Sequence, residues 1–102
     1  MQRDPRAFLW DVRESALAIQ AFTEGMDSAA YAANAMAQAA VERKFEVIGE
    51  ALSQLALPQI VAFRNQLIHG YATVNVGTVW NIAQNALPSL LDAVQELLNE
   101  LK

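Results

Sequence analysis

The chain has 102 residues, the size of one domain; 54% are hydrophobic and the formal charge is −4. It has no cysteine and one histidine, which excludes a disulfide framework and a thiol nucleophile and argues against a zinc site within one subunit. The negative charge argues against a protein that coats nucleic acid by bulk charge. No apolar run approaches the ~20 residues that span a bilayer, and residues 1–5 contain no apolar signal core. We therefore expect a cytoplasmic protein with no membrane contact.

Alanine accounts for 19 residues, and only 4 glycines and 3 prolines interrupt the chain. Alanine is the best helix former, and so few turn residues do not suit a sandwich or a barrel. We predict a single all-α domain over residues 1–102, an antiparallel bundle of four to five helices. A small monomer leaves part of such an apolar sequence uncovered, so we expect a homodimer or a higher homo-oligomer.

The first helix is expected to start at Asp4, an N-cap residue, and to end at Gly25. Pro5 occupies the first helical position, which suits proline. Trp10 lies off the apolar face of this helix and is available to another subunit. The apolar face itself is predicted to comprise Phe8, Val12, Ser15, Ala16, Ile19 and Phe22.

A second helical stretch is expected from Asp27 or Ser28, with a break near Asn34, to about Leu55. Gly49 inside it weakens the helix by roughly 1 kcal/mol relative to alanine, so we expect it to allow close approach of a neighbouring helix. The apolar stripe is predicted to comprise Ala37, Val41, Lys44, Phe45, Ile48, Leu52 and Leu55.

The remaining sequence predicts two more helices. The third runs from Leu57 to His69 and is closed by Gly70, with a short loop after it. The fourth runs from about Val76 to Leu101. Pro88 should kink this last helix, because its ring removes a hydrogen bond and clashes with the preceding turn.

One polar segment interrupts the apolar pattern of the third helix. It contains the single histidine, His69, together with Arg64, Asn65 and Tyr71. On a helix Asn65 and His69 share a face, whereas Arg64 and His69 diverge by about 140°. Because His69 is predicted to lie in the last turn and arginine is long, both groups could still reach one cleft.

The spacing Arg64-x4-His69-x-Tyr71 resembles the Rx4HxY motif of the HEPN superfamily and, more specifically, of the HepT-like toxins of HepT–MntA toxin–antitoxin pairs. The resemblance covers nearly the whole chain. It departs from the family in the connection between residues 52 and 63, which is shorter and lacks a tryptophan, and at Asn75, where aspartate is common. Further matching segments are Phe22-Thr23-Glu24-Gly25, Val41-Glu42-Arg43, Ile48-Gly49-Glu50-Ala51 and Val79-Trp80.

This resemblance implies a metal-independent endoribonuclease toxin without a cofactor, whose composite active site forms at a homodimer interface. It also implies a nucleotidyltransferase antitoxin that silences the toxin by attaching AMP to Tyr71. The resemblance and the residue chemistry together predict catalytic roles for Arg64 and His69, substrate positioning by Asn65 and Tyr71, and supporting roles for Glu50 and Arg43.

Elementary chemistry leads to the same residues. Cleaving a phosphodiester without metal needs a base, an acid and a cation for the developing charge. Histidine exchanges protons near neutral pH, and arginine binds phosphate through two parallel hydrogen bonds. One His69 cannot comfortably supply both the base and the acid, but a two-fold dimer supplies two. AMP on Tyr71 would add bulk and negative charge that exclude RNA.

Structural roles remain open for the same residues. His69 could complement the end of its helix, and Arg64 could pair with Glu46 or Glu50 across the bundle. If Arg64 pairs with Glu50, then Glu50 would be a buried acid that orients Arg64.

Asn65, Tyr71, Arg43 and Lys44 also have ordinary explanations in backbone hydrogen bonding, core packing and solvation.

Two other functions therefore stay open. One is a non-catalytic nucleotide-binding, substrate-binding or regulatory subunit of a minimal nucleotidyltransferase. The other is a helical dimerisation domain without a ligand.

Overall fold

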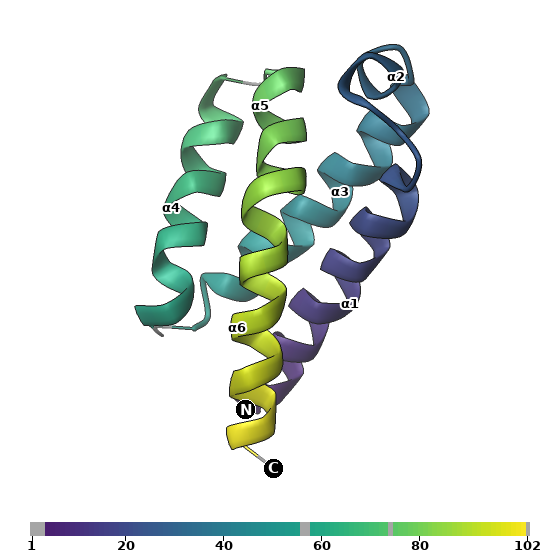
Figure 1. The fold of residues 1–102 in the computed structure, drawn as a ribbon. Helices are drawn as coiled ribbons and strands as arrows, with labels where there is room; N and C mark the ends of the chain where they lie inside the picture. The colour runs from purple at the N-terminus through teal and green to yellow at the C-terminus, as the bar shows by residue number, and fades with distance from the viewer. Residues whose placement is uncertain (1–3, 56–57, 74, 102) are drawn as a thin grey trace.

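The computed structural model describes residues 4–55, 58–73 and 75–101, and within this part the side chains of residues 59, 66 and 68–73 are not described. All of its regular structure is helical, as predicted. Figure 1 shows α1, α3, α4 and the rod made by α5, η1 and α6 alternating in direction, as in an antiparallel bundle. The elements are α1 (Pro5–Thr23), α2 (Ser28–Ala32), α3 (Ala35–Leu52), α4 (Pro58–Thr73), α5 (Val76–Asn81), the π-helix η1 (Ile82–Ala86) and α6 (Leu87–Glu100).

Two helices start at capping residues that the sequence predicts, Asp4 and Asp27, and a third starts at the predicted break, Asn34. The Asp4 carboxylate accepts a hydrogen bond from the Arg6 backbone N–H at 2.9 Å, and Asp27 accepts one from Ala30 at 2.8 Å. Asn34 accepts the Ala37 N–H at 2.9 Å, so the predicted break separates α2 from α3. Each cap satisfies an N–H that has no partner inside its own helix.

The cap at Asp4 is strengthened by a second contact. The Arg6 guanidinium donates to the Asp4 carboxylate at 2.6 Å. These hydrogen bonds, with the backbone N–H of Arg6, lower the pKa of Asp4 to about 2. The predicted stop is also confirmed, because Gly25 follows α1 with a φ of 79°, in the left-handed region that glycine adopts without strain.

The bundle core is formed by one apolar stripe from each long helix. On α1 the stripe is rotated from the predicted one: Leu9 and Thr23 are buried, whereas Phe8 is half-buried and Phe22 is 40% exposed. The prediction for Phe22 is therefore wrong, because contacts with both α3 and α6 set the rotation of α1. On α3 the predicted positions are confirmed except for Lys44, which is half-buried. The buried stripe of α3 comprises Ala37, Val41, Phe45, Ile48, Ala51 and Leu52.

Gly49 faces α4 as predicted, but close approach does not require it. A Cβ atom built on Gly49 would lie 3.5 Å from Leu67 Cδ2, which is an ordinary van der Waals contact. The neighbouring helices are held instead by larger side chains, including Phe45 and Phe63, whose ring centroids lie 6.5 Å apart.

The described part of α4 begins at Pro58, and the predicted start at Leu57 lies outside the described residues; the helix does not end before Gly70. It continues to Thr73, so the predicted stop is wrong. A glycine ends a helix only when its backbone turns to positive φ; Gly70 remains helical. The next helix starts where Asn75 accepts the Thr78 N–H at 3.2 Å.

A π-helix, η1, lies directly before Leu87 and Pro88, where the sequence predicts a kink. The chain from Val76 to Glu100 changes from α5 to η1 and then to α6, and the Leu87 N–H donates to the Ile82 carbonyl five residues earlier. A proline ring clashes with the carbonyl four residues before it, which here belongs to Gln84 within η1. The wider π turn relieves this clash without breaking the rod.

We predict opposite stability changes for alanine at two glycines. Gly49→Ala should raise the free energy of unfolding by up to about 1 kcal/mol, because the methyl group fits and alanine favours the helix. Gly25→Ala should lower it by about 1 kcal/mol, because position 25 needs a positive φ although space is open around it. Urea unfolding of both variants checks this, and destabilisation by Gly49→Ala would contradict the 3.5 Å contact.

Tyr31 gives a pH-dependent prediction. Its ring packs against Trp80 with centroids 5.1 Å apart, and its side chain is buried. Burial, with a smaller effect of the Glu42 carboxylate, raises the pKa of Tyr31 to about 12. Because the folded pKa lies above the unfolded value near 10, the contribution of Tyr31 to stability is present below pH ~10 and is lost as pH rises through ~12.

Ultraviolet titration of the tyrosinates should therefore show an ionisation near pH 12 that Tyr31→Phe removes. The stability of the wild type should also fall more steeply than that of Tyr31→Phe between pH ~10 and ~12. An unaltered titration curve in Tyr31→Phe would show that this phenol is not the protected one.

Candidate functional site

The four motif positions lie on one continuous helix. Arg64, Asn65, His69 and Tyr71 all belong to α4, which passes through Gly70 without a break. The helical register therefore holds over the whole motif and separates positions 64 and 69 by about 140° around the axis. Because the helix does not end at His69, the register continues to position 71. The side chains of His69 and Tyr71 lie outside the described part.

The rotation of α4 is set by its buried residues. Ile60, Phe63 and Leu67 are buried, and α4 packs against α3 on one side and against η1 and α6 on the other. Arg64 follows Phe63 directly and is half-buried, while Asn65 is exposed. The apolar contacts of α4 therefore direct these two polar side chains toward the surface.

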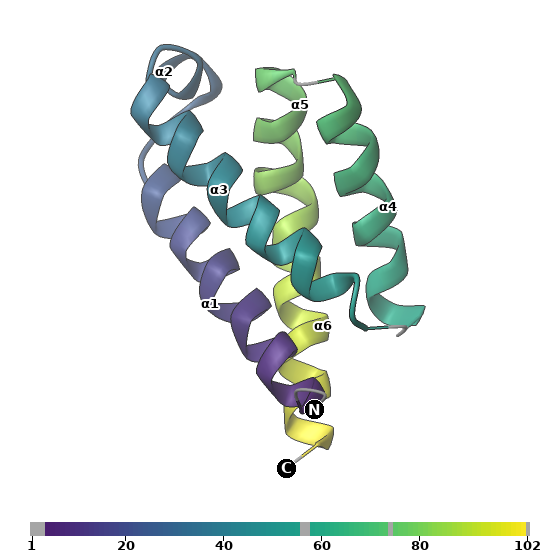
Figure 2. The same ribbon diagram turned by 180° about the vertical axis from the view of Figure 1, so that it is seen from behind.

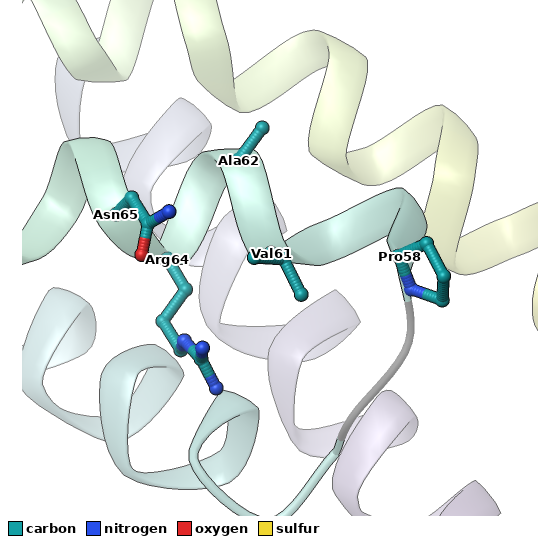
Figure 3. Close-up of a pocket in the computed structure, with 5 residues that line it drawn as sticks. All are labelled: Pro58, Val61, Ala62, Arg64 and Asn65. Atoms are coloured by element: carbon teal, nitrogen blue, oxygen red, sulfur yellow. The ribbon is translucent and has the colours of Figure 1, made fainter.

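An open hollow of about 550 Å³ lies on this side of α4, and its lining comprises Pro58, Val61, Ala62, Arg64 and Asn65. Figure 3 shows Arg64 extending from the opposite side of the helix to Ala62, with Val61 between Pro58 and the polar pair. The hollow thus combines a cation and an amide at one end with an apolar floor toward the start of α4. This composition suits a ligand with an anionic group and an apolar part.

Arg64 forms no ion pair with a carboxylate in the described part of the chain. The ion pairs found there join Arg6 to Asp4, Arg13 to Glu14 and Arg43 to Glu46, so none involves Arg64. The two ion pairs considered for Arg64, with Glu46 and with Glu50, are both missing. A half-buried guanidinium without a carboxylate partner can accept a phosphate group.

The two supporting residues lie on α3. Glu50 is exposed, so the expectation of a buried acid is wrong. In the described part, the contact shown for this residue is through its backbone, whose carbonyl accepts the Ser53 hydroxyl at 2.6 Å. Arg43 is also exposed and donates to Glu46 at 3.2 Å. Neither residue contributes to the hollow, and both sit on a solvated face, as the structural alternative for Arg43 proposed.

Sequence reasoning did not identify the apolar lining of the hollow. Pro58, Val61 and Ala62 are exposed or half-buried although apolar. A signal for them existed, because the segment Pro58–Thr73 carries apolar residues on both of its faces rather than on one. Such a helix has more apolar surface than its own bundle covers.

Across residues 4–55, 58–73 and 75–101, no group of three or more histidine, cysteine, aspartate or glutamate side chains could hold a metal ion. In the same residues, no helix has the length and apolar character to cross a membrane.

Comparison with known proteins finds a match over most of the chain. The family described as "Ribonuclease HepT-like" matches residues 12–58 and 53–97. The two matched parts share residues 53–58. No solved structure matches this chain.

Curated relatives agree with the family match. A Methanocaldococcus jannaschii protein named "Putative RNase" is 31% identical over 112 residues, which cover 99% of this chain and 93% of the relative. A second protein of the same name and organism is 31% identical, covering 92% and 96% of the two chains. A Thermococcus cleftensis protein named "Probable ribonuclease HepT" is 28% identical, covering 95% and 98%.

Proposed function

The chain belongs to the HepT-like ribonuclease family, and from this premise we propose that it is a metal-independent endoribonuclease toxin with a composite active site at a homodimer interface. The observation that carries the proposal is that the positive charge of Arg64 is not paired with a carboxylate in the described part of the chain. This guanidinium lies in an open hollow beside Asn65, and no carboxylate in the described part neutralises it.

The reaction follows from the groups available. One His69 imidazole takes the proton of a ribose 2′-hydroxyl, and the oxygen attacks the adjacent phosphorus. A second His69, as imidazolium, gives a proton to the leaving 5′-oxygen. Arg64 stabilises the charge that develops on the phosphate oxygens, and Asn65 supplies an amide that can hydrogen-bond the phosphate or the ribose.

The helical register supports the need for a second copy. Positions 64 and 69 are separated by about 140° around α4, so one helix does not turn both toward the same point. Two α4 helices related by a two-fold axis can combine Arg64 of one copy with His69 of the other. Half-buried Val61 and exposed Ala62, which line the same hollow as Arg64, would be covered by this pairing.

The same register supports Tyr71 as the modified residue. Position 71 is seven residues after Arg64 on the continuous helix, which returns it to within about 20° of position 64. AMP attached by a nucleotidyltransferase antitoxin would then bring its phosphate next to Arg64. The AMP phosphate would bind the Arg64 guanidinium, which would then no longer be available to RNA, and its negative charge would repel the RNA backbone.

We predict that the purified protein cleaves single-stranded RNA in EDTA. His69→Ala and Arg64→Gln should each lower the cleavage rate by about 100-fold or more, because each removes a proton-transfer group or the phosphate-binding cation. Arg13→Gln is the matched control, since Arg13 lies on α1 and contacts Gln95 and Glu14. A requirement for added metal, or full activity in His69→Ala, contradicts the mechanism. Nucleotide binding without any RNA cleavage would favour the regulatory subunit.

We also predict a covalent modification. When the chain is produced together with a minimal nucleotidyltransferase antitoxin, its intact mass should increase by one or more AMP units and its RNA cleavage should be lost. Tyr71→Phe should keep the unmodified mass. An equal mass increase in Tyr71→Phe would assign the modification to another residue.

A further inference from the structure

We propose that the outward face of α1 is a second self-association surface, on which α1 packs antiparallel against α1 of another copy. This proposal is independent of the ribonuclease proposal, because it rests on α1 alone. The surface, called the α1 seam below, consists of Ala7, Trp10, Glu14, Leu17 and Ala21.

The α1 seam has the spacing of a coiled-coil contact. Its members follow one another at intervals of three and four residues, the a and d positions of a heptad. They lie opposite the buried stripe of α1, and none of them is buried. Trp10 is 52% and Leu17 40% exposed. A helix with apolar residues in heptads on its solvent side has a face suited to another helix.

The largest side chain of the α1 seam is already held in place. The Arg13 guanidinium lies 4.8 Å from the centroid of the Trp10 ring. Arg13 also donates to Gln95 at 3.0 Å, which ties this pair to α6, and to Glu14 at 2.9 Å. The ring therefore loses little conformational freedom on association, and the charge of the one acidic member of the seam is paired locally.

Size and charge favour the antiparallel arrangement. A two-fold axis between residues 15 and 16 places Trp10 opposite the partner subunit's Ala21, a large residue against a small one. The same axis places Glu14, which is paired with Arg13 in its own chain, opposite the partner subunit's Leu17. A parallel arrangement would instead place Trp10 against the partner subunit's Trp10, and Glu14 against an identical carboxylate.

The edge of the α1 seam carries complementary charges at its two ends. Arg6 and Glu24 are eighteen residues apart, five full helical turns, so they lie along the same edge. Both are exposed. In the antiparallel arrangement Arg6, whose guanidinium also bonds Asp4 in its own chain, lies next to the partner subunit's Glu24. Glu24 caps the C-terminal end of α1, where a carboxylate is unfavourable and no basic residue lies in the last turn, so a partner cation would relieve it.

The α1 seam and the hollow on α4 can be occupied together. Figures 1 and 2 show α1 and α4 at opposite edges of the bundle. A chain with two separate self-complementary surfaces assembles beyond a dimer, into a tetramer or an open array. A second copy is the occupant we infer because the seam is complementary to itself in size and charge.

The test measures the mass of the full-length chain in solution by sedimentation over a range of concentrations. Leu17→Glu should weaken self-association at least tenfold, because it introduces a carboxylate into the α1 seam. Met36→Glu is the matched control, since Met36 is 79% exposed and lies on α3. Both positions are exposed, and circular dichroism should confirm that both variants fold.

Charge reversal tests the arrangement. Arg6→Glu and Glu24→Arg should each weaken association, and the double variant should restore it, because the pair re-forms with its charges exchanged. Association that is unchanged in Leu17→Glu, or a double variant no better than the single ones, overturns the proposal. A fall in assembly size with RNA cleavage retained separates the α1 seam from the proposed active site, whereas loss of cleavage in Arg64→Gln at unchanged size concerns that site alone.

Discussion

The burial of one face of α4 is the interaction on which the candidate site depends. Ile60, Phe63 and Leu67 are inserted between α3 and α6, and this packing sets the rotation of the helix. Because Arg64 directly follows one of these residues, its side chain emerges at the edge of the buried face rather than in the middle of a solvated one. A half-buried position restricts where the guanidinium can go and removes some competing water, which strengthens its attraction for an anion.

The continuity of the helices has a chemical consequence. Since α4 runs through Gly70, the motif is a rigid strip in which positions 64 and 71 share a side and position 69 does not. The helical rod formed by α5, η1 and α6 is also continuous, because the π turn before Pro88 relieves the clash that the proline ring would cause. The apolar residues left exposed on α4 and on α1 are consistent with the apolar excess of the composition.

Arg64 differs from the other arginines of the described part because it is not in an ion pair. The chain is acidic, and three of its arginines in the described part lie in ion pairs with nearby carboxylates. Bulk attraction for RNA is therefore weak, so the proposed RNA contact depends on local groups such as Arg64. In the described part of the chain, the hollow on α4 brings a cation, an amide and an apolar floor together.

Local signals were sufficient for much of the fold. Asp4, Asp27 and Asn34 cap helices because their short side chains reach the free N–H groups of the next turn, and Gly25 ends α1 because it tolerates positive φ. The segment that carries the motif could also be found from sequence, because its residue types and spacing do not depend on packing. Tertiary contacts decided the rest. They rotated α1 so that Phe22 is exposed, carried α4 past Gly70, and left Glu50 in solvent away from Arg64. A periodic pattern specifies that a helix has an apolar side, but the direction in which that side finally points is an outcome of how several helices share one core.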